Sequence, residues 1–166
     1  MLFLKQEELI QIFQDYRRKL CNYIYYKCGD MKLAEDLVQE VFVILWEKRD
    51  SVKHVSLKSY LYTIANHLYI DHYRHKNVEM ELIHKRQDDS MAESPEYLLE
   101  VKEFDNRLKL AIASLSEKER TVFLMNRIDQ LTFKEIAESL NISVKAVEKR
   151  MHHAVDHLFL KVNHKL

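Results

Sequence analysis

Apolar side chains recur every three or four positions along most of the chain, the spacing that places them on one face of a helix. The pattern predicts a helix over about residues 7–27 and another over about 31–49. Gly29 ends the first and Asp30 caps the second. A third helix is expected over about 57–76. The chain holds one Gly and one Pro, too few for a fold rich in β-turns, so the predicted fold class is all-α.

The same periodicity assigns an inner face to each of these helices. The residues expected to be buried are Ile10, Phe13, Leu20 and Ile24 in the first helix, Leu37, Val38, Val41, Phe42, Leu45 and Trp46 in the second, and Leu57, Leu61, Ile64 and Leu68 in the third. The polar side of the second helix then carries Asp36, Gln39, Glu40 and Glu47.

Helical patterning stops after the third helix. The acidic stretch 79–93 has little of it and is interpreted as a flexible linker. Ser94 followed by Pro95 then restarts a helix that reaches about Ala113. The sequence therefore predicts two small helical domains joined by an acidic flexible linker: an N-terminal helical bundle over 1–77, the linker over 78–103, and a C-terminal four-helix domain over 104–166.

The C-terminal domain contains the spacing of a helix-turn-helix. Thr132 and Glu135 form a capping box that begins a helix at Phe133, and Asn141 stands where a left-handed turn residue is needed. Ser143 then caps a second helix. Such a pair commonly places its second helix in the DNA major groove, and the bland alternative is an ordinary helical hairpin.

The second helix of this pair has a buried side and a cationic side. Its buried stripe is expected to be Val147, Met151, Val155 and Leu158. Glu148 can accept a hydrogen bond from a cytosine amino group, and Lys149 can reach guanine or phosphate. The outward side chains expected to lie against DNA are Lys145, Glu148, Lys149, Arg150, His152 and His153, with Arg150 contacting the backbone or packing locally.

The formal net charge is zero, but the charges are unevenly distributed. Residues 1–77 hold 12 Lys or Arg against 10 Asp or Glu, residues 78–106 hold 3 against 9, and residues 107–166 hold 11 against 7. The three segments therefore carry +2, −6 and +4, which account for the 26 charges of each sign. Nucleic-acid binding by the two basic ends is compatible with this neutral total.

The two cysteines and the N-terminus bear on the compartment. Cys21 and Cys28 lie seven positions apart, a spacing that suits neither a CxxC motif nor a local disulfide. Two reduced thiols are expected, which fits a cytoplasmic protein. The apolar start of the chain is too short for a signal peptide, and no stretch is long enough to span a bilayer, so no membrane insertion is expected.

The third helix combines aromatic and cationic side chains. Five residues separated by three or four positions share one helix face: Tyr62, Asn66, Tyr69, Tyr73 and Lys76. Further basic or imidazole groups lie nearby at Lys53, His54, Lys58, His67, His72, Arg74 and His75. Aromatic rings beside cations suit stacking on unpaired bases and neutralising phosphates. With equal weight, these tyrosines can belong to the core with only their hydroxyls at the surface.

A metal site is a third interpretation of the histidines. His67, Asp71 and His75 follow an i, i+4, i+8 spacing, and His153 and His157 are four apart, so each set can share a helix face. Both segments are cationic, and neither a nearby Cys nor an HExxH motif accompanies them. No metal and no cofactor are therefore expected.

Three motifs follow one another in order. The acidic second helix contains AEDLVQEVF at 34–42, the third helix contains YLYTIANHLYIDHYR at 60–74, and LSEKERTVF at 115–123 precedes the helix-turn-helix. This order resembles the bacterial RNA polymerase sigma factors of the small extracytoplasmic-function group. The resemblance extends from about Glu8 to Leu160.

The resemblance implies a subunit rather than an enzyme, one that binds core RNA polymerase and directs it to promoter DNA. By analogy, core polymerase would be bound by Asp36, Gln39 and Glu40. The melted minus-ten element would be bound by Lys53, His54, Lys58, Tyr62, Asn66, His67 and Tyr69, and the minus-thirty-five element by the outward side chains of the second helix of the helix-turn-helix. The acidic linker would thread the polymerase interior, and an anti-sigma factor is a further partner that the family implies.

One departure from the family falls in the third helix. Many relatives carry Arg-Asn after Ile64-Ala65, where this chain has Asn66-His67, so the family's pocket Asn aligns with His67. The base preference at that position cannot be carried over. The alternative function is a stand-alone helix-turn-helix regulator with an N-terminal sensor or dimerisation domain. A sensor domain has no need of an acidic second helix followed by an aromatic third one, which favours the sigma factor.

Overall fold

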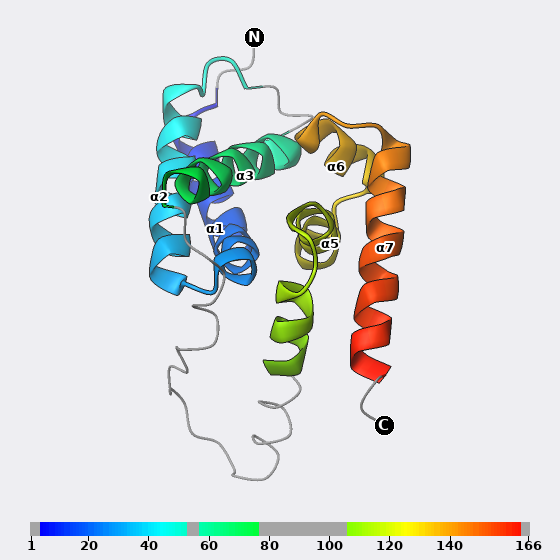
Figure 1. Cartoon of the computed structure of the whole chain (residues 1–166). Coiled ribbons are helices and arrows are strands. Elements are labelled where there is room, and N and C mark those ends of the chain that lie inside the picture. The colour runs from blue at the N-terminus through cyan, green and yellow to red at the C-terminus, as the bar shows by residue number, and fades with distance from the viewer. Residues whose placement is uncertain (1–3, 53–56, 77–105, 164–166) are drawn as a thin grey trace, which may run out of the picture.

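The computed structural model describes residues 4–52, 57–76 and 106–163, and these segments form helices and turns with no strand among them. The N-terminal half consists of α1 (Gln6–Cys28), α2 (Met31–Glu47) and α3 (Leu57–Lys76). The C-terminal half begins with a helix over 106–113 and continues with α5 (Glu117–Asp129), α6 (Phe133–Leu140) and α7 (Val144–Asn163) (Figure 1). The all-α fold class is confirmed, and the predicted linker over 78–103 lies outside the described residues.

The helix ends lie where the caps place them. Gly29 takes the left-handed conformation that closes α1, with φ of 70°. The Asp30 carboxylate accepts a hydrogen bond from the Leu33 amide at 3.1 Å and so starts α2. Complete capping boxes begin α5 at Ser116 and α6 at Thr132, and Asn141 ends α6 with φ of 52°. Local sequence signals therefore fix these boundaries.

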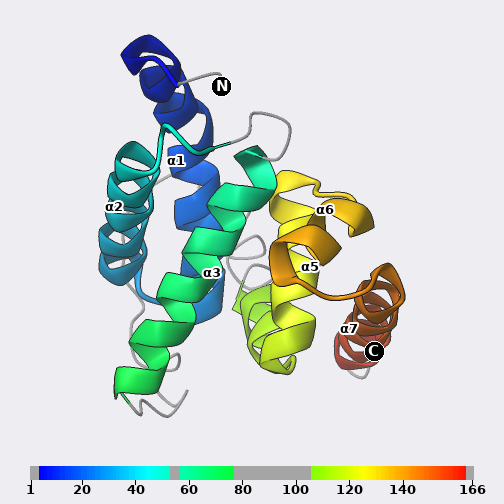
Figure 2. The same cartoon turned by 90° about the horizontal axis from the view of Figure 1, so that it is seen from above.

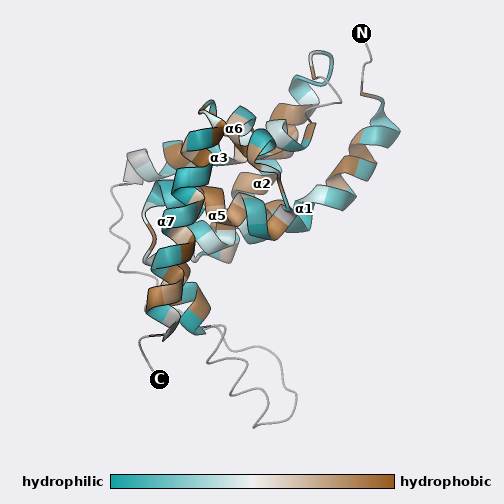
Figure 3. Cartoon of the chain, turned by 90° about the vertical axis from the view of Figure 1, so that its right-hand side faces the viewer, coloured by the Kyte–Doolittle hydropathy of each residue, from teal (hydrophilic) through white to brown (hydrophobic). Residues whose placement is uncertain are grey.

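The N-terminal helices pack around a core to which Leu20, Ile24, Val38, Val41, Leu45 and Leu61 all contribute. The predicted inner face of α1 is wrong over its first half, because Ile10 is 53% exposed and Phe13 is 40% exposed. The buried residues there are Leu9 and Ile12. The first turns of α1 extend beyond the other helices, so the stripe of residues that meets a neighbour shifts by one position (Figures 2 and 3).

The other misplaced core residues lie at helix margins. Trp46 is 46% exposed near the end of α2, and Phe42 is half-buried, making an edge contact with the Phe13 ring at 4.9 Å between centroids. In α7, Val155 is 41% exposed and Ala154 is fully buried in its place. Val147, Met151 and Leu158 are buried as predicted.

The two halves lie against each other. Figures 1 and 2 show that α3 passes alongside α6 while α1 lies beside α5, and α1–α5 and α3–α6 are both packed pairs. The apolar residues of both halves form one continuous core. Helix α3 is consequently enclosed on two sides, by α1 and α2 on one and by the C-terminal half on the other.

Candidate functional site

Helix α7 presents polar side chains on the side away from its buried stripe. Its start is fixed by the Ser143 hydroxyl, which accepts a hydrogen bond from the Ala146 amide at 3.1 Å. Lys145, Glu148 and Lys149 are exposed along the first turns. The helix therefore offers two cations and one carboxylate to solvent without disturbing its packing against α5 and α6.

The remaining predicted contacts on α7 are less free. Arg150 is half-buried, which agrees with the expectation that it packs locally. His152 lies 3.2 Å from the Asp156 carboxylate one turn on, and His153 lies 3.8 Å from the Glu119 carboxylate of α5. Both imidazoles remain largely exposed, so each carboxylate competes with any phosphate for the same ring.

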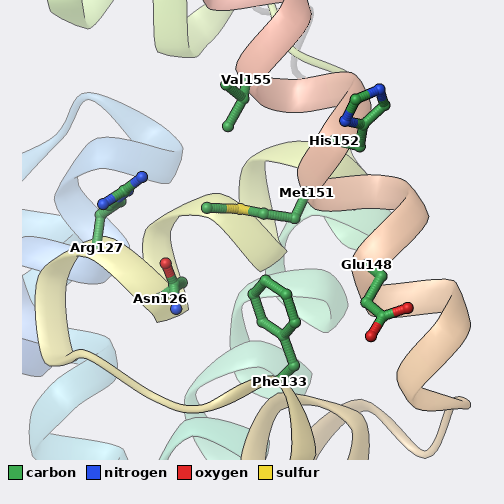
Figure 4. Close-up of a pocket in the computed structure, with 7 residues that line it drawn as sticks. All are labelled: Asn126, Arg127, Phe133, Glu148, Met151, His152 and Val155. Carbon is green, nitrogen blue, oxygen red and sulfur yellow. The ribbon is translucent and has the colours of Figure 1, made fainter.

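A shallow pocket of about 380 Å³ separates α7 from α5 and α6 (Figure 4). Its lining residues are Asn126, Arg127, Phe133, Glu148, Met151, His152 and Val155. Figure 4 shows the Phe133 ring and the Met151 thioether between the helices, with the Glu148 carboxylate at one edge. The Glu148 side chain is therefore held beside an apolar floor at the start of the recognition helix.

The outward face of α2 is accessible along its length. Asp36, Gln39 and Glu40 are all exposed, opposite the buried Leu37 and Val41. Two large apolar side chains lie among them on the same face, since Val43 and Trp46 are also exposed. Sequence reasoning placed Trp46 in the core and so missed that this face is both acidic and apolar.

The aromatic face predicted for α3 is not an exposed surface. Tyr62, Asn66 and Tyr69 are almost completely buried. The Tyr62 ring meets the Tyr23 ring of α1 edge-on with centroids 5.1 Å apart, and the Tyr69 hydroxyl donates to the Lys27 carbonyl at 3.2 Å. The expectation of exposure is therefore corrected in favour of its alternative, because α3 uses these residues to pack against α1.

Lys27 is the centre of this packing and is fully buried. Its ammonium donates to Asn66 Oδ1 and to Thr121 Oγ1 at 2.8 Å each, and forms an ion pair with Glu117 at 2.7 Å. The Tyr69 ring centroid lies 4.3 Å away. Burial lowers the pKa of Lys27 to about 8, and attraction to the Glu117 carboxylate opposes that shift. No sequence pattern marked this lysine, because a single cation on an amphipathic helix normally faces water.

The side of α3 that remains open carries different residues. His67 is exposed, and Tyr60, seven positions earlier and therefore on the same face, is half-buried. Lys58 is half-buried, while Lys53 and His54 lie outside the described residues. Tyr60 was not among the predicted contacts, although its spacing from His67 was a signal for it.

The histidines do not form a metal cluster in the described part of the chain. Among its side chains, no group of three or more His, Cys, Asp or Glu is placed to hold a metal ion. The His75 side chain is outside the described residues. Cys21 and Cys28 are both unpaired by disulfide, and burial raises the pKa of the Cys28 thiol to about 11.

Comparison with known proteins identifies both halves. A model described as sigma-70 region 2 matches residues 12–78, and one described as sigma-70, region 4 matches residues 105–158. Over the whole chain, the ECF RNA polymerase sigma factor SigW of Bacillus subtilis (strain 168) is 30% identical across 163 residues, covering 89% of this chain and 84% of that protein. The RNA polymerase sigma factor YlaC of the same organism is 26% identical across 154 residues, covering 90% and 88%.

Solved structures share the fold. CnrH in complex with the cytosolic domain of CnrY superimposes with a TM-score of 0.74 at 20% identity, over 98% of this chain and 92% of that one. The sigma factor RpoE of Bartonella quintana in complex with the anti-sigma factor NepR also gives 0.74 at 20% identity, over 96% and 99%.

The two matched regions and the helix arrangement define a sigma-70-type protein with region 2 in its N-terminal half and region 4 in its C-terminal half. The chain belongs to the extracytoplasmic-function RNA polymerase sigma factors. The stand-alone regulator is not favoured, since it accounts for region 4 but not for region 2. Within the described ranges, no helix combines the length and apolar character required to cross a membrane.

Proposed function

We propose that this chain directs core RNA polymerase to promoters by reading the minus-thirty-five element with α7 while α2 holds the polymerase. The observation that carries the proposal is the exposed polar side of α7, which offers Lys145, Glu148 and Lys149 opposite a buried stripe. A helix in this position can enter the major groove without unfolding its domain. The chain acts as a non-enzymatic subunit in the cytoplasm, where core polymerase is found.

The outward face of α2 is suited to a protein partner. Its carboxylates at Asp36 and Glu40 complement a basic surface and guide the encounter. The exposed Trp46 and Val43 add apolar contact area between them, and tryptophan is enriched at protein interfaces. We assign this face, with Gln39, to core polymerase.

For the minus-ten element, the open side of α3 is the better surface. Tyr60 and His67 can stack on unpaired bases, and Lys58 can neutralise a phosphate. Lys53 and His54 precede this surface in sequence and remain proposed contacts. Tyr62, Asn66 and Tyr69 act from behind it, by holding α3 to α1.

An anti-sigma factor is proposed as a further partner. The relatives with this fold include one bound to an anti-sigma factor and one bound to the cytosolic domain of CnrY. A partner of that kind would have to bind a form of the chain that polymerase cannot use.

The test is run-off transcription from a promoter library in which both elements are randomised, with core polymerase and this chain. The wild-type chain should select one pair of elements that core polymerase alone does not select. Glu148→Ala or Lys149→Ala should relax base preference at one or two minus-thirty-five positions, by about 1–3 kcal/mol per lost base contact, and leave minus-ten preference unchanged. Lys161→Ala, an exposed change near the other end of α7, is the matched control. Parental minus-thirty-five preference in both test variants would remove α7 from the reading role.

A further inference from the structure

The contact between the two halves of the chain is a polar seam. At one end, Lys27 of α1 reaches Glu117 and Thr121 of α5. At the other end, the Ser139 hydroxyl of α6 donates to the Ser59 carbonyl of α3 at 3.0 Å, and the Thr63 hydroxyl donates to the Ser139 carbonyl at 3.0 Å. These bonds join residues 76 to 94 positions apart in sequence.

The seam is satisfied internally rather than apolar. Arg120 of α5 donates to the Lys27 carbonyl at 3.4 Å, so even the backbone at the end of α1 is paired across it. Interfaces between domains that move are commonly more polar than permanent ones, because polar groups regain hydrogen bonds with water when the halves separate. A seam of this composition holds the halves in register and can still open.

The closed arrangement conflicts with a promoter. Elements at minus-ten and minus-thirty-five are roughly 25 base pairs apart, which is about 85 Å of duplex at about 3.4 Å per base pair. A compact chain of 166 residues has a radius of gyration of about 15 Å, equivalent to a sphere about 40 Å across. With α5 and α6 seated on α1 and α3, one chain cannot place its two halves on both elements.

The seam also occupies a residue proposed for DNA. The pKa of the Glu135 carboxylate is lowered mainly by its hydrogen bond from the Thr132 amide, and Lys58 contributes a smaller lowering by its positive charge. Glu135 belongs to α6 and Lys58 to α3, so a carboxylate of one half lies near a cation of the other. In the closed form, that carboxylate stands where a phosphate would otherwise approach Lys58.

We propose that the α1–α3 face is an intramolecular docking surface for α5 and α6 that keeps the free chain closed, and that polymerase and promoter binding require this seam to open. The proposal rests on the proposed sigma-factor function for what opening achieves, but the seam itself is measurable without polymerase. The seam thereby limits promoter binding by chain that is not held on the enzyme.

A disulfide across the seam tests the proposal. Ser59→Cys with Ser139→Cys places two thiols where the hydroxyl of one residue already meets the backbone of the other. The native thiols should not compete, because Cys21 is buried, Cys28 is half-buried, and burial raises the pKa of both. Rapid cross-linking of the free double variant under mild oxidant is the expected result. A folded double variant that does not cross-link would overturn the closed arrangement.

Opening is tested in the same background. Glu117→Lys places a second cation against the buried Lys27, so the cross-linking rate should fall several-fold. Glu138→Lys makes the same change of charge on the exposed side of α6 and should leave the rate unchanged. Equal rates in the two variants would show that the Lys27 contact does not hold the seam.

The functional arm compares oxidised and reduced protein in run-off transcription with core polymerase. The cross-linked chain should give at least tenfold less transcript, and reductant should restore the level of the single-cysteine variants treated in the same way. Full activity in the cross-linked state would overturn the requirement for opening. A wild-type chain with no activity at all would contradict only the proposed function, because the cross-linking rate still reports on the seam.

Discussion

Replacing Lys27 with Met should remove a specific pH dependence from the stability of the protein. The substitution keeps most of the side-chain volume and deletes the buried ammonium. Its three hydrogen-bonding partners keep alternatives: Tyr23 also donates to Asn66 at 3.4 Å, Thr121 also donates to Glu117 at 3.0 Å, and the Glu117 carboxylate is partly exposed to water. We therefore expect the variant to fold, with stability near that of the wild type at neutral pH.

The magnitude follows from the pKa of Lys27, which burial lowers from 10.5 to about 8. Because the folded chain holds this proton less tightly than the unfolded chain, raising the pH through 8 favours folding, and the gain continues towards 10.5. Between pH 7 and pH 9, the wild type should gain about 1 kcal/mol over the variant. Above pH 9 the Cys28 thiol works in the opposite direction, because its pKa is raised to about 11, but both proteins share it.

Urea unfolding followed by circular dichroism at pH 7, 8 and 9 measures the difference directly. The free energy of unfolding of the wild type should rise relative to that of Lys27→Met over this range. Lys149→Met, which changes an exposed lysine, should run parallel to the wild type. Parallel curves for the wild type and Lys27→Met would refute the buried, polar-bonded lysine on which the seam depends.

Three further outcomes are expected. Tyr62→Ala should destabilise the protein by about 3–5 kcal/mol in urea unfolding, as loss of a buried ring does, and a loss below about 1 kcal/mol would contradict its place in the core. Asp36→Arg should stop co-purification with core polymerase while circular dichroism stays unchanged, and normal co-purification would remove this face of α2 from docking. Tyr60→Ala and His67→Ala should lower permanganate reactivity of promoter thymines more than they lower closed-complex binding, and unchanged reactivity would place the base contacts elsewhere.

Local signals in the sequence were sufficient for the helix boundaries. Asp30, Ser116 and Thr132 each offer a side-chain oxygen to an amide three residues on, and Gly29 and Asn141 tolerate positive φ, so each end depends on a few neighbouring residues. The outward positions on α2 and α7 were equally accessible to prediction. They need only the period of one helix and the sign of its polar residues.

The faces of α3 could not be predicted in the same way. Tyr62 and Tyr69 have rings large enough to fill a core and hydroxyls that suit a surface, so periodicity left both interpretations open. The decision depends on α1, which supplies Tyr23 and the Lys27 carbonyl to meet them. Lys27 itself becomes buried only because α5 closes over it from 90 residues further along the chain. Packing between distant helices is not encoded in any local pattern.

The distance between the two halves, with and without promoter complex, tests the account most directly. Lys32→Cys on α2 and Lys161→Cys on α7 change exposed residues and can carry a pair of spin labels or dyes. In the free chain the two labels should lie within about 40 Å of each other, the size of a compact chain of this length. In the complex with core polymerase and promoter, their separation should increase to beyond about 60 Å, because the two elements lie far apart on the duplex. An unchanged separation in a complex that transcribes would contradict the account.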